Sequence, residues 1–243
     1  MKLTIITVAI SNDKDLHRTI QSIKRCSFDT QEVELVVVCP EYVDTPYDIK
    51  HFRHIIDEKK GIFQAMNAGL KQARGEFVFF LNAGDIFYSR NVLKNIWPFL
   101  SDETKIVAGN VEIFFKNIST LTNCSPWIPH QGAFIPKNFF SDRFYRTDFK
   151  FFGDLEFWLY LNQIGKFTIN RLDITIAKFE YGGLGNCGEF CFMRAQERIK
   201  LAIMYHKKPY RLIRLTQATV AKLTFLLFGR NLYYYLSIKR KLW

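Results

Sequence analysis

Apolar runs alternate with amphipathic stretches along the first hundred residues of the chain. Leu3–Val8, Val33–Val38 and Phe77–Leu81 are continuous apolar runs rich in β-branched or aromatic residues, which is typical of strands that are covered on both faces. A shorter run at His54–Ile56 predicts another strand between the last two. The pattern therefore predicts four strands in this part of the chain.

Two stretches between these strands have the spacing of helices. Apolar residues recur three or four positions apart in Asp15–Cys26 and in Gly61–Arg74, and Gly75 is expected to end the second helix. Strands that alternate with helices form a mostly parallel sheet with helices on both faces. The expected fold class is therefore α/β, with a Rossmann-like central sheet.

Polar residues follow each of these four strands. Ligands of open α/β sheets bind beyond the carboxyl ends of the strands. The segments that leave the strands are therefore expected to line one crevice. They are Thr7–Asn12, Cys39–Asp44, Asp57–Gly61 and Asn82–Asp85.

The second half of the chain is less regular. Lys105–Phe115 and Thr168–Lys178 predict strands, whereas Asn138–Phe144 and Asp154–Ile164 predict helices. The stretch Asn117–Pro129 is expected to be a loop. Strands and helices therefore continue to about residue 180, in a less regular order.

Charge separates a helical C-terminal extension, residues 189–243, from the rest of the chain. The net charge is +11, from 34 basic and 23 acidic residues, and no acidic residue follows Glu197 although eleven basic ones do. The residues after Glu197 therefore carry the whole excess. Basic helices with aromatic residues commonly lie in a membrane interface. We expect the extension to touch an anionic membrane surface; packing on the rest of the chain and a homodimer interface are the alternatives.

Two acidic positions are candidates for chemistry. Asp85 comes just after a predicted strand and beside a glycine, where a carboxylate can hold a divalent ion against phosphates, or else cap a helix or stabilise a turn. Asp154 and Glu156 stand at the start of a predicted helix. Asp154 could also cap this helix, with Glu156 as a first-turn acid that the helix dipole favours. The residues alone leave these alternatives open.

A longer ordered set of residues is more specific. It runs DEKKGIFQAMNAGL at 57–70, GE at 75–76 and FLNAGD at 80–85. This set resembles family 2 glycosyltransferases with the GT-A fold, over roughly residues 1–185, and is similar to transferases that build bacterial surface polysaccharides of the colanic acid type. The resemblance implies a catalytic domain over 1–188, with a nucleotide-binding half (1–104) and an acceptor and catalytic-base half (105–188).

The resemblance implies roles on the nucleotide side. Thr7-Val8-Ala9 match the end of the first strand, whose backbone contacts the base and ribose. Lys60-Gly61 and Asn67 match the loop and helix that close over the nucleotide. Relatives have an acidic, glycine-rich turn after the second strand, where this chain has Pro40 and Glu41. Glu41 is the candidate to replace the missing carboxylate.

The resemblance also implies a metal site for Mn²⁺ or Mg²⁺. Asp85 matches the carboxylate that is expected to touch the ion, whereas Asn82 and Gly84 stand where many relatives have carboxylates. Asn82 is therefore a candidate for the donor side of the site. One anionic ligand implies metal binding that depends on the bound diphosphate.

Residues later in the chain match the part of the family that handles the acceptor. Asp154 matches the first acid of a segment that supplies the general base, and Glu156 is expected to point elsewhere. His130-Gln131-Gly132 have parallels near the donor sugar and acceptor, although a lone histidine is often structural. Tyr181-Gly182-Gly183 are either a hinge for a lid or a tight turn.

These observations imply an inverting glycosyltransferase of the hexosyl or N-acetylhexosaminyl type. It would move a sugar from a nucleotide-diphosphate donor, expected to be UDP-linked, to a hydroxyl of a growing surface glycan or lipid-linked oligosaccharide. A nucleotidyltransferase is an alternative, but it would usually have a glycine-rich loop where this chain has Ala9-Ile10-Ser11-Asn12. A basic nucleic-acid-binding protein is another, but no helix-turn-helix, RNP-like or zinc signature supports it, and no nucleic-acid partner is expected.

The expected location is the cytoplasm, peripheral on the inner face of the cytoplasmic membrane. The N-terminal apolar run is too short for the core of a signal peptide with a cleavage site and instead predicts a strand. The five cysteines form no CxxC pair, so free thiols in a reducing compartment are expected.

Overall fold

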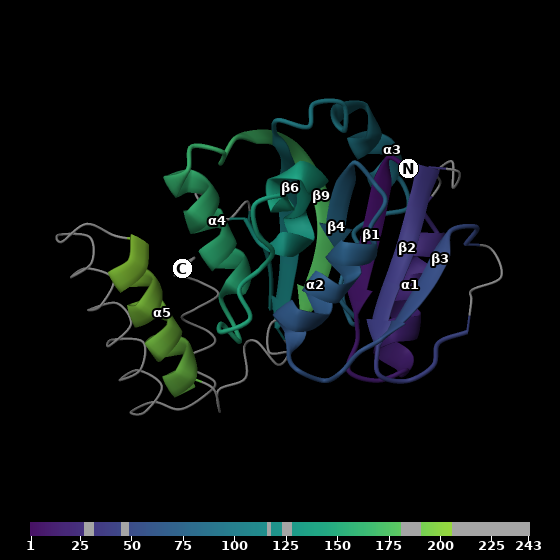
Figure 1. Cartoon of the computed structure of the whole chain (residues 1–243). Helices are drawn as coiled ribbons and strands as arrows, with labels where there is room; N and C mark the ends of the chain where they lie inside the picture. Colours follow the sequence, from purple (N-terminus) through teal and green to yellow (C-terminus); the bar gives the residue numbers. More distant parts are fainter. Residues whose placement is uncertain (27–31, 45–48, 116–117, 123–127, 181–190, 206–243) are drawn as a thin grey trace.

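The strands form one nine-stranded sheet in the computed structural model, which describes residues 1–26, 32–44, 49–115, 118–122, 128–180 and 191–205. The strand order is β3-β2-β1-β4-β8-β6-β9-β5, and β7 pairs with β6. Figure 1 shows β3, β2, β1 and β4 side by side in this order. The strands are β1 (Leu3–Val8), β2 (Val33–Cys39), β3 (Phe52–Ile56), β4 (Phe77–Phe80), β5 (Ile86–Phe87), β6 (Ile106–Phe115), β7 (Ile118–Thr122), β8 (Ala133–Pro136) and β9 (Ile169–Glu180). The α-helices are α1 (Lys14–Lys24), α2 (Ile62–Gln72), α3 (Val92–Ile96), α4 (Gly153–Gln163) and α5 (Cys191–Tyr205).

The N-terminal half of the sheet is parallel. β1 pairs with β2 on one side and with β4 on the other, and β3 lies outside β2. Because successive side chains of a strand point to opposite faces, Ile5 joins the buried cluster of Leu16 in α1, whereas Ile6 joins that of Met66 in α2. The two helices therefore cover opposite faces of the sheet (Figure 1), as the sequence pattern predicts.

The sheet changes direction after β4. β8 is antiparallel to both β4 and β6, whereas β9 is parallel to β6 and antiparallel to β5. Helix α4 covers the same face as α2, because Phe157 and Trp158 share a buried cluster with Met66. The expected α/β class is confirmed, with a parallel first half and a mixed second half.

Two segments differ from the expectation. The expected loop Asn117–Pro129 contains β7, which pairs with β6 in a hairpin through residues such as Ser119, whose hydroxyl donates to Glu112 Oε1 (2.6 Å). The expected helix Asn138–Phe144 is only a short 3₁₀ turn, Lys137–Phe140. The conformation of both segments depends on the strands beside them. The spacing of apolar residues along the sequence does not report such neighbours.

Gly75 does not end α2. The helix stops at Gln72, and Ala73 is its extended C-cap. A β-carbon at Gly75 would lie 2.4 Å from the backbone nitrogen of Thr4, and the Gly75 N–H donates to the Thr4 hydroxyl (2.8 Å). Gly75 is therefore needed where the chain passes close to β1, so that β4 can pair with it.

Two of the five cysteines can be assessed in the structure. Cys26 and Cys39 are buried free thiols, in agreement with the expectation, and burial raises the pKa of Cys26 to about 12. A thiol with so high a pKa is unreactive near neutral pH.

Helix α5 packs against α4. Leu201 shares a buried cluster with Phe149 and Leu159, so the first part of the C-terminal extension is joined to the rest of the fold. Tyr181-Gly182-Gly183 and residues 206–243 lie outside the described residues. None of the described helices has the length and apolar character that crossing a bilayer requires. The domain boundary near residue 188 stays a prediction.

Candidate active site

The turn that carries Asp85 is fixed where β4 ends. Asp85 N–H donates to the Asn82 carbonyl (2.9 Å), and Gly84 adopts a positive φ of 95° that few other residues reach without strain. The Gly84 N–H donates to the hydroxyl of Thr19 (3.0 Å), and Arg18 donates to the Gly84 carbonyl (2.7 Å). Helix α1 thus holds the turn from outside the crevice.

One short segment joins the two candidate carboxylates. The 3₁₀ turn His130–Gly132 precedes β8. His130 Nδ1 lies 3.0 Å from Asp154 Oδ2, and the side chain of the next residue, Gln131, donates to Asp85 Oδ2 (3.0 Å). The candidate base and the candidate metal ligand, 69 positions apart in the numbering, therefore contact adjacent residues.

The partners of His130 indicate which of its ring nitrogens donates and which accepts. Its Nε2 lies 3.1 Å from Asn82 Nδ2, an amide nitrogen that can only donate. Nε2 is therefore the acceptor, and Nδ1 carries the proton that is donated to Asp154. The side chain of His130 therefore holds the Asp154 carboxylate, and its expected place near the donor sugar stays a prediction.

Asp154 lies in the first turn of α4 but does not cap it. The N-cap is Phe152, which has no side-chain capping bond. Asp154 Oδ1 accepts from the N–H of Leu155 (2.8 Å). The side chain of Asp154 is partly exposed. Asp154 is therefore not the N-cap residue of α4. Its carboxylate is held by hydrogen bonds and is partly exposed.

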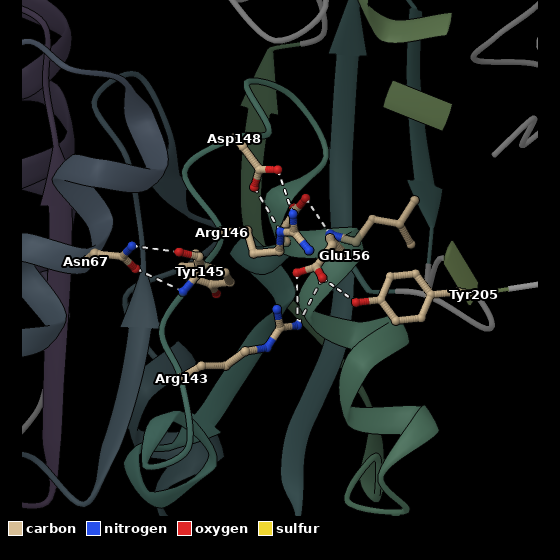
Figure 2. A network of polar contacts seen from close by, with 9 residues as sticks. Asn67, Arg143, Tyr145, Arg146, Asp148, Glu156 and Tyr205 are labelled. Carbon is tan, nitrogen blue, oxygen red and sulfur yellow. Dashed lines mark hydrogen bonds and ion pairs between the residues drawn. The ribbon is translucent and has the colours of Figure 1, made fainter. Parts of the chain in front are cut away.

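Glu156 points away from this site, as expected. Its side chain is fully buried, and the Arg143 guanidinium donates to both carboxylate oxygens (3.0 Å each). The hydroxyl of Tyr205 donates to the same carboxylate (Figure 2). A buried charge needs such partners, so Glu156 serves the fold of α4 and not proton transfer.

Burial changes the acidity of Asp85. It raises the pKa of the Asp85 carboxyl to about 6, although the charge of Arg18 and the hydrogen bond from Gln131 act in the opposite direction. Removal from water penalises the charged form. A divalent ion would restore the ionised form, because it pairs with the carboxylate charge.

The residues around Asp85 fit a metal that is bound mainly by phosphate. The part of the chain that the structure describes holds no group of three acidic, histidine or cysteine side chains suited to a metal ion. However, the side-chain oxygen of Asn82 is buried without a hydrogen-bond partner in the same turn. Mg²⁺ and Mn²⁺ favour oxygen ligands and commonly take the remainder from phosphate and water. Asp85 and Asn82 are therefore the residues that would hold the ion.

The predicted nucleotide-side residues lie at the carboxyl ends of β1, β2 and β3. Thr7 and Val8 end β1, and the N–H of Ala9 donates to Val38 (2.9 Å). The carboxylate of Glu41 accepts from the N–H of Asn12 (2.8 Å). Glu41 therefore bridges the segments that follow β1 and β2, and its nucleotide-side role stays a prediction.

Three exposed apolar side chains at the same strand ends were not singled out from the sequence. They are Ile10, Tyr42 and Ile56, which are 66%, 71% and 60% exposed. Large apolar side chains exposed together in a ligand crevice commonly pack against a ring. Only the sheet order brings them together, since β1, β2 and β3 are neighbours.

The loop before α2 has the backbone of a tight turn. Lys59 has a φ of 57° and Gly61 a φ of 123°, and Lys60 pairs with Glu58 on the surface. Gly61 is the N-cap of α2, and its φ requires glycine. The exposed N–H groups that begin α2 therefore face the crevice side of the sheet without a side-chain cap.

The side chain of Asn67 is hydrogen-bonded to the segment before α4. Its amide nitrogen donates to the Tyr145 carbonyl (2.8 Å), and its amide oxygen accepts from the Tyr145 N–H (3.0 Å), as Figure 2 shows. The side chain of Asn67 is thus engaged in fixing the segment before α4. In the described part of the chain the Tyr145 hydroxyl is buried without a hydrogen-bond partner, and the nucleotide-side role of Asn67 stays a prediction.

These features define an α/β protein of the GT-A class, with a mixed sheet and a carboxylate turn at the end of its fourth strand. A family model described as glycosyl transferase family 2 matches residues 4–175. The chain belongs to this family. The enzyme class expected from the sequence is thereby confirmed at the level of the family.

Individual relatives agree with this assignment. The poly(ribitol-phosphate) β-N-acetylglucosaminyltransferase TarP of Staphylococcus aureus (strain N315) is 30% identical over 98 residues, which span 37% of this chain and only 30% of that protein. Among solved structures, residues 1–349 of S. aureus TarS in complex with UDP-GlcNAc give a TM-score of 0.62 at 17% identity, covering 95% of this chain and 74% of TarS 1–349.

A second similar solved structure comes from a different organism. The mannosyltransferase PcManGT from Pyrobaculum calidifontis, in complex with GDP-Man and Mn²⁺, gives a TM-score of 0.65 at 17% identity, covering 99% of this chain and 79% of that one. At these identities the structural matches establish the GT-A fold.

The raised pKa of Asp85 gives the metal-free protein a specific pH response. Between the ordinary Asp pKa of 3.8 and the folded-state value of about 6, the folded protein binds the proton and the unfolded chain does not. Rising pH therefore lowers the free energy of unfolding in this interval. We expect wild type to lose on the order of 2 kcal/mol relative to Asp85→Asn between about pH 4 and about pH 7.

Urea unfolding of both proteins with a chelator present measures this difference. Asp142→Asn is the control for sign, because Lys166 lowers the pKa of Asp142, and wild type should gain stability against that variant as the pH rises. Identical pH profiles for wild type and Asp85→Asn would show that Asp85 is not buried in a way that raises its pKa.

Proposed function

We propose that the chain is an inverting glycosyltransferase that uses a nucleotide-diphosphate sugar and a hydroxyl acceptor. The observation that carries the proposal is that the turn His130–Gly132 holds both Asp154 and the Asp85 turn through adjacent side chains. A general base and a diphosphate-binding turn must lie on the two sides of one anomeric carbon. This connection fixes them relative to each other.

Asp154 is the proposed catalytic base. Its carboxylate accepts the proton of the acceptor hydroxyl while that oxygen attacks the anomeric carbon and the bond to the diphosphate breaks. The N–H of His130 stays on Asp154 Oδ2 and orients the carboxylate. Direct attack from the face opposite the leaving group inverts the anomeric configuration, and the products are the glycosylated acceptor and a nucleoside diphosphate.

A divalent metal is part of the proposal. Asp85 and Asn82 are the residues that would hold it, and the bound ion would neutralise charge on the departing diphosphate. The Mn²⁺ in the PcManGT complex supports this assignment, since that protein shares the GT-A fold. Gln131 keeps the Asp85 carboxylate oriented toward the crevice through its hydrogen bond.

We propose that the donor is UDP-linked and that the sugar is a hexose or an N-acetylhexosamine. UDP-GlcNAc in the TarS complex and the activity in the name of TarP support this choice. The exposed side chains of Ile10, Tyr42 and Ile56 are proposed to supply apolar surface for the base, and the Glu41 carboxylate is proposed to accept from a ribose hydroxyl. The acceptor is proposed to be a hydroxyl of a surface glycan or of a lipid-linked oligosaccharide.

The base assignment is tested by Asp154→Asn. The amide cannot take the proton, so transfer is expected to fall by about 10²–10⁴-fold, whereas donor binding measured by calorimetry should persist. Release of nucleoside diphosphate from a panel of nucleotide sugars measures turnover and also separates transfer from nucleotidyl transfer, which releases pyrophosphate.

Asp142→Asn is the matched control for this experiment, because Asp142 is an exposed carboxylate that pairs with Lys166 outside the crevice. It should keep wild-type turnover. Near-normal turnover by Asp154→Asn would remove Asp154 from the role of base.

The metal assignment is tested by Asp85→Ala. The variant should bind the nucleoside diphosphate with Mn²⁺ at least about tenfold more weakly than wild type, because the one anionic protein ligand is lost. Titration with and without Mn²⁺ isolates the metal-dependent part. Unchanged metal-dependent affinity would exclude Asp85 from the metal site.

We also propose that the C-terminal extension binds the anionic inner face of the cytoplasmic membrane. The support is its composition, since all eleven basic residues after Glu197 lie in a stretch without an acidic residue. Replacing Lys239, Arg240 and Lys241 with glutamine in the full chain should weaken binding to phosphatidylglycerol vesicles, because each basic residue near an anionic surface contributes about 1 kcal/mol.

Vesicle sedimentation at low and high salt measures this binding, with pure phosphatidylcholine vesicles as the control. Equal sedimentation of wild type and variant would contradict the membrane proposal. Light scattering of the same samples would then report whether the extension forms a homodimer instead.

A further inference from the structure

The last acidic residue of the chain makes an unusual set of contacts. Glu197 of α5 accepts three hydrogen bonds from consecutive backbone N–H groups: Oε1 from Lys150 (2.6 Å), and Oε2 from Phe151 (3.0 Å) and Phe152 (3.1 Å). A carboxylate that accepts several backbone N–H bonds makes strong, charge-assisted contacts. One side chain therefore fixes the backbone of three successive residues.

These three residues lead directly into the helix that carries the proposed base. Phe152 is the N-cap of α4, and Asp154 follows two positions later. The N-cap has no side-chain capping bond of its own. Glu197 thus fixes, from another helix, the backbone that leads into α4, up to and including the N–H of the N-cap residue.

Further contacts anchor α5 beside this segment. Lys200 donates to Asp148 Oδ2 (2.6 Å), which also accepts from Arg146 (2.6 Å). Tyr205 donates to Glu156 in the first turn of α4, and Figure 2 shows Arg143 on the same carboxylate. The helix is therefore attached to the α4 segment both before and after Asp154.

The first turn of α4 packs closely against α2, so this end of the helix has little room to shift. A β-carbon on Gly153 would lie 2.7 Å from the ring of Phe63 in α2. The side chain of Asp154 is held by His130, while its backbone is held through Glu197. Without the Glu197 contacts, the backbone before Asp154 would lose its three hydrogen bonds to α5. The contact with His130 would then be the remaining one of these two supports for Asp154.

We propose that Glu197 is a positioning residue for Asp154, so that docking of α5 is required for turnover and not for donor binding. This inference rests on the proposed function of Asp154 as the base. The donor side of the crevice is built by β1, β2 and β3, and its residues make none of the contacts of Glu197 described above. A change at Glu197 should consequently separate kcat from the KM of the donor.

Glu197→Gln is the first test. The amide presents two donors where the carboxylate accepted, so at least one backbone N–H loses its partner. We expect kcat to fall by about 10–100-fold with an unchanged donor KM, because a displacement of about 1 Å near the chemistry can cost ~100-fold. Gln196→Ala, at the exposed neighbouring position of the same helix, should keep wild-type kcat.

A structural measurement that is independent of turnover accompanies the kinetics. Amide hydrogen exchange of a peptide covering residues 148–156 should be slow in wild type and in Gln196→Ala, and faster in Glu197→Gln. Tyr205→Phe removes a different α5 contact, and it should give the same split between kcat and KM with a smaller effect. This second variant decides the question if Glu197→Gln does not fold.

The outcomes separate the inference from the proposed function. Faster exchange with unchanged kcat in Glu197→Gln, alongside an inactive Asp154→Asn, would overturn the positioning role and leave the base assignment intact. Normal turnover by Asp154→Asn would overturn both. A parallel rise in donor KM and fall in kcat would show that α5 supports the whole crevice and would also overturn the positioning role.

Discussion

The antiparallel pairing of β8 with β4 is the constraint on which the candidate site depends. Phe79 pairs with Phe134 in this ladder, and their rings stack at 4.3 Å between centroids. The pairing places the start of β8 beside the end of β4. The turn His130–Gly132 therefore lies next to the turn that carries Asp85. Because β8 runs antiparallel to β4, this turn contacts both Asp85 and Asp154.

Buried polar groups then connect this site to the outer helices. The Thr4 hydroxyl accepts from the Gly75 N–H, and the Asn67 amide is hydrogen-bonded to the backbone of Tyr145. The Glu156 carboxylate accepts from Arg143 and Tyr205. Each group would be costly to bury alone. Because each has its partners in a different element, these contacts specify how α2, α4 and α5 sit on the sheet, and hence where Asp154 lies.

Local pattern predicted much of the fold and part of the site. Leu3–Val8 is a strand as expected, because six buried apolar or small residues in succession suit a covered strand. The pattern missed β7 and misjudged Gly75, since both depend on what packs against them. The contact of His130 with Asp154 and the clamp of Asn67 on Tyr145 depend on the sheet order, which no local spacing records. For Glu197 a signal existed, because it is the last acidic residue of the sequence and eleven basic residues follow it.

The solitary carboxylate in the Asn82–Asp85 turn has a thermodynamic consequence under the proposed function. A metal that takes most of its ligands from the diphosphate binds with high affinity only when the donor is present. By reciprocity, the metal raises donor affinity by the same factor. The enzyme would therefore fill its crevice in proportion to the product of the two concentrations, and departure of the nucleoside diphosphate would take the ion with it. Each turnover would then begin with a protein free of metal.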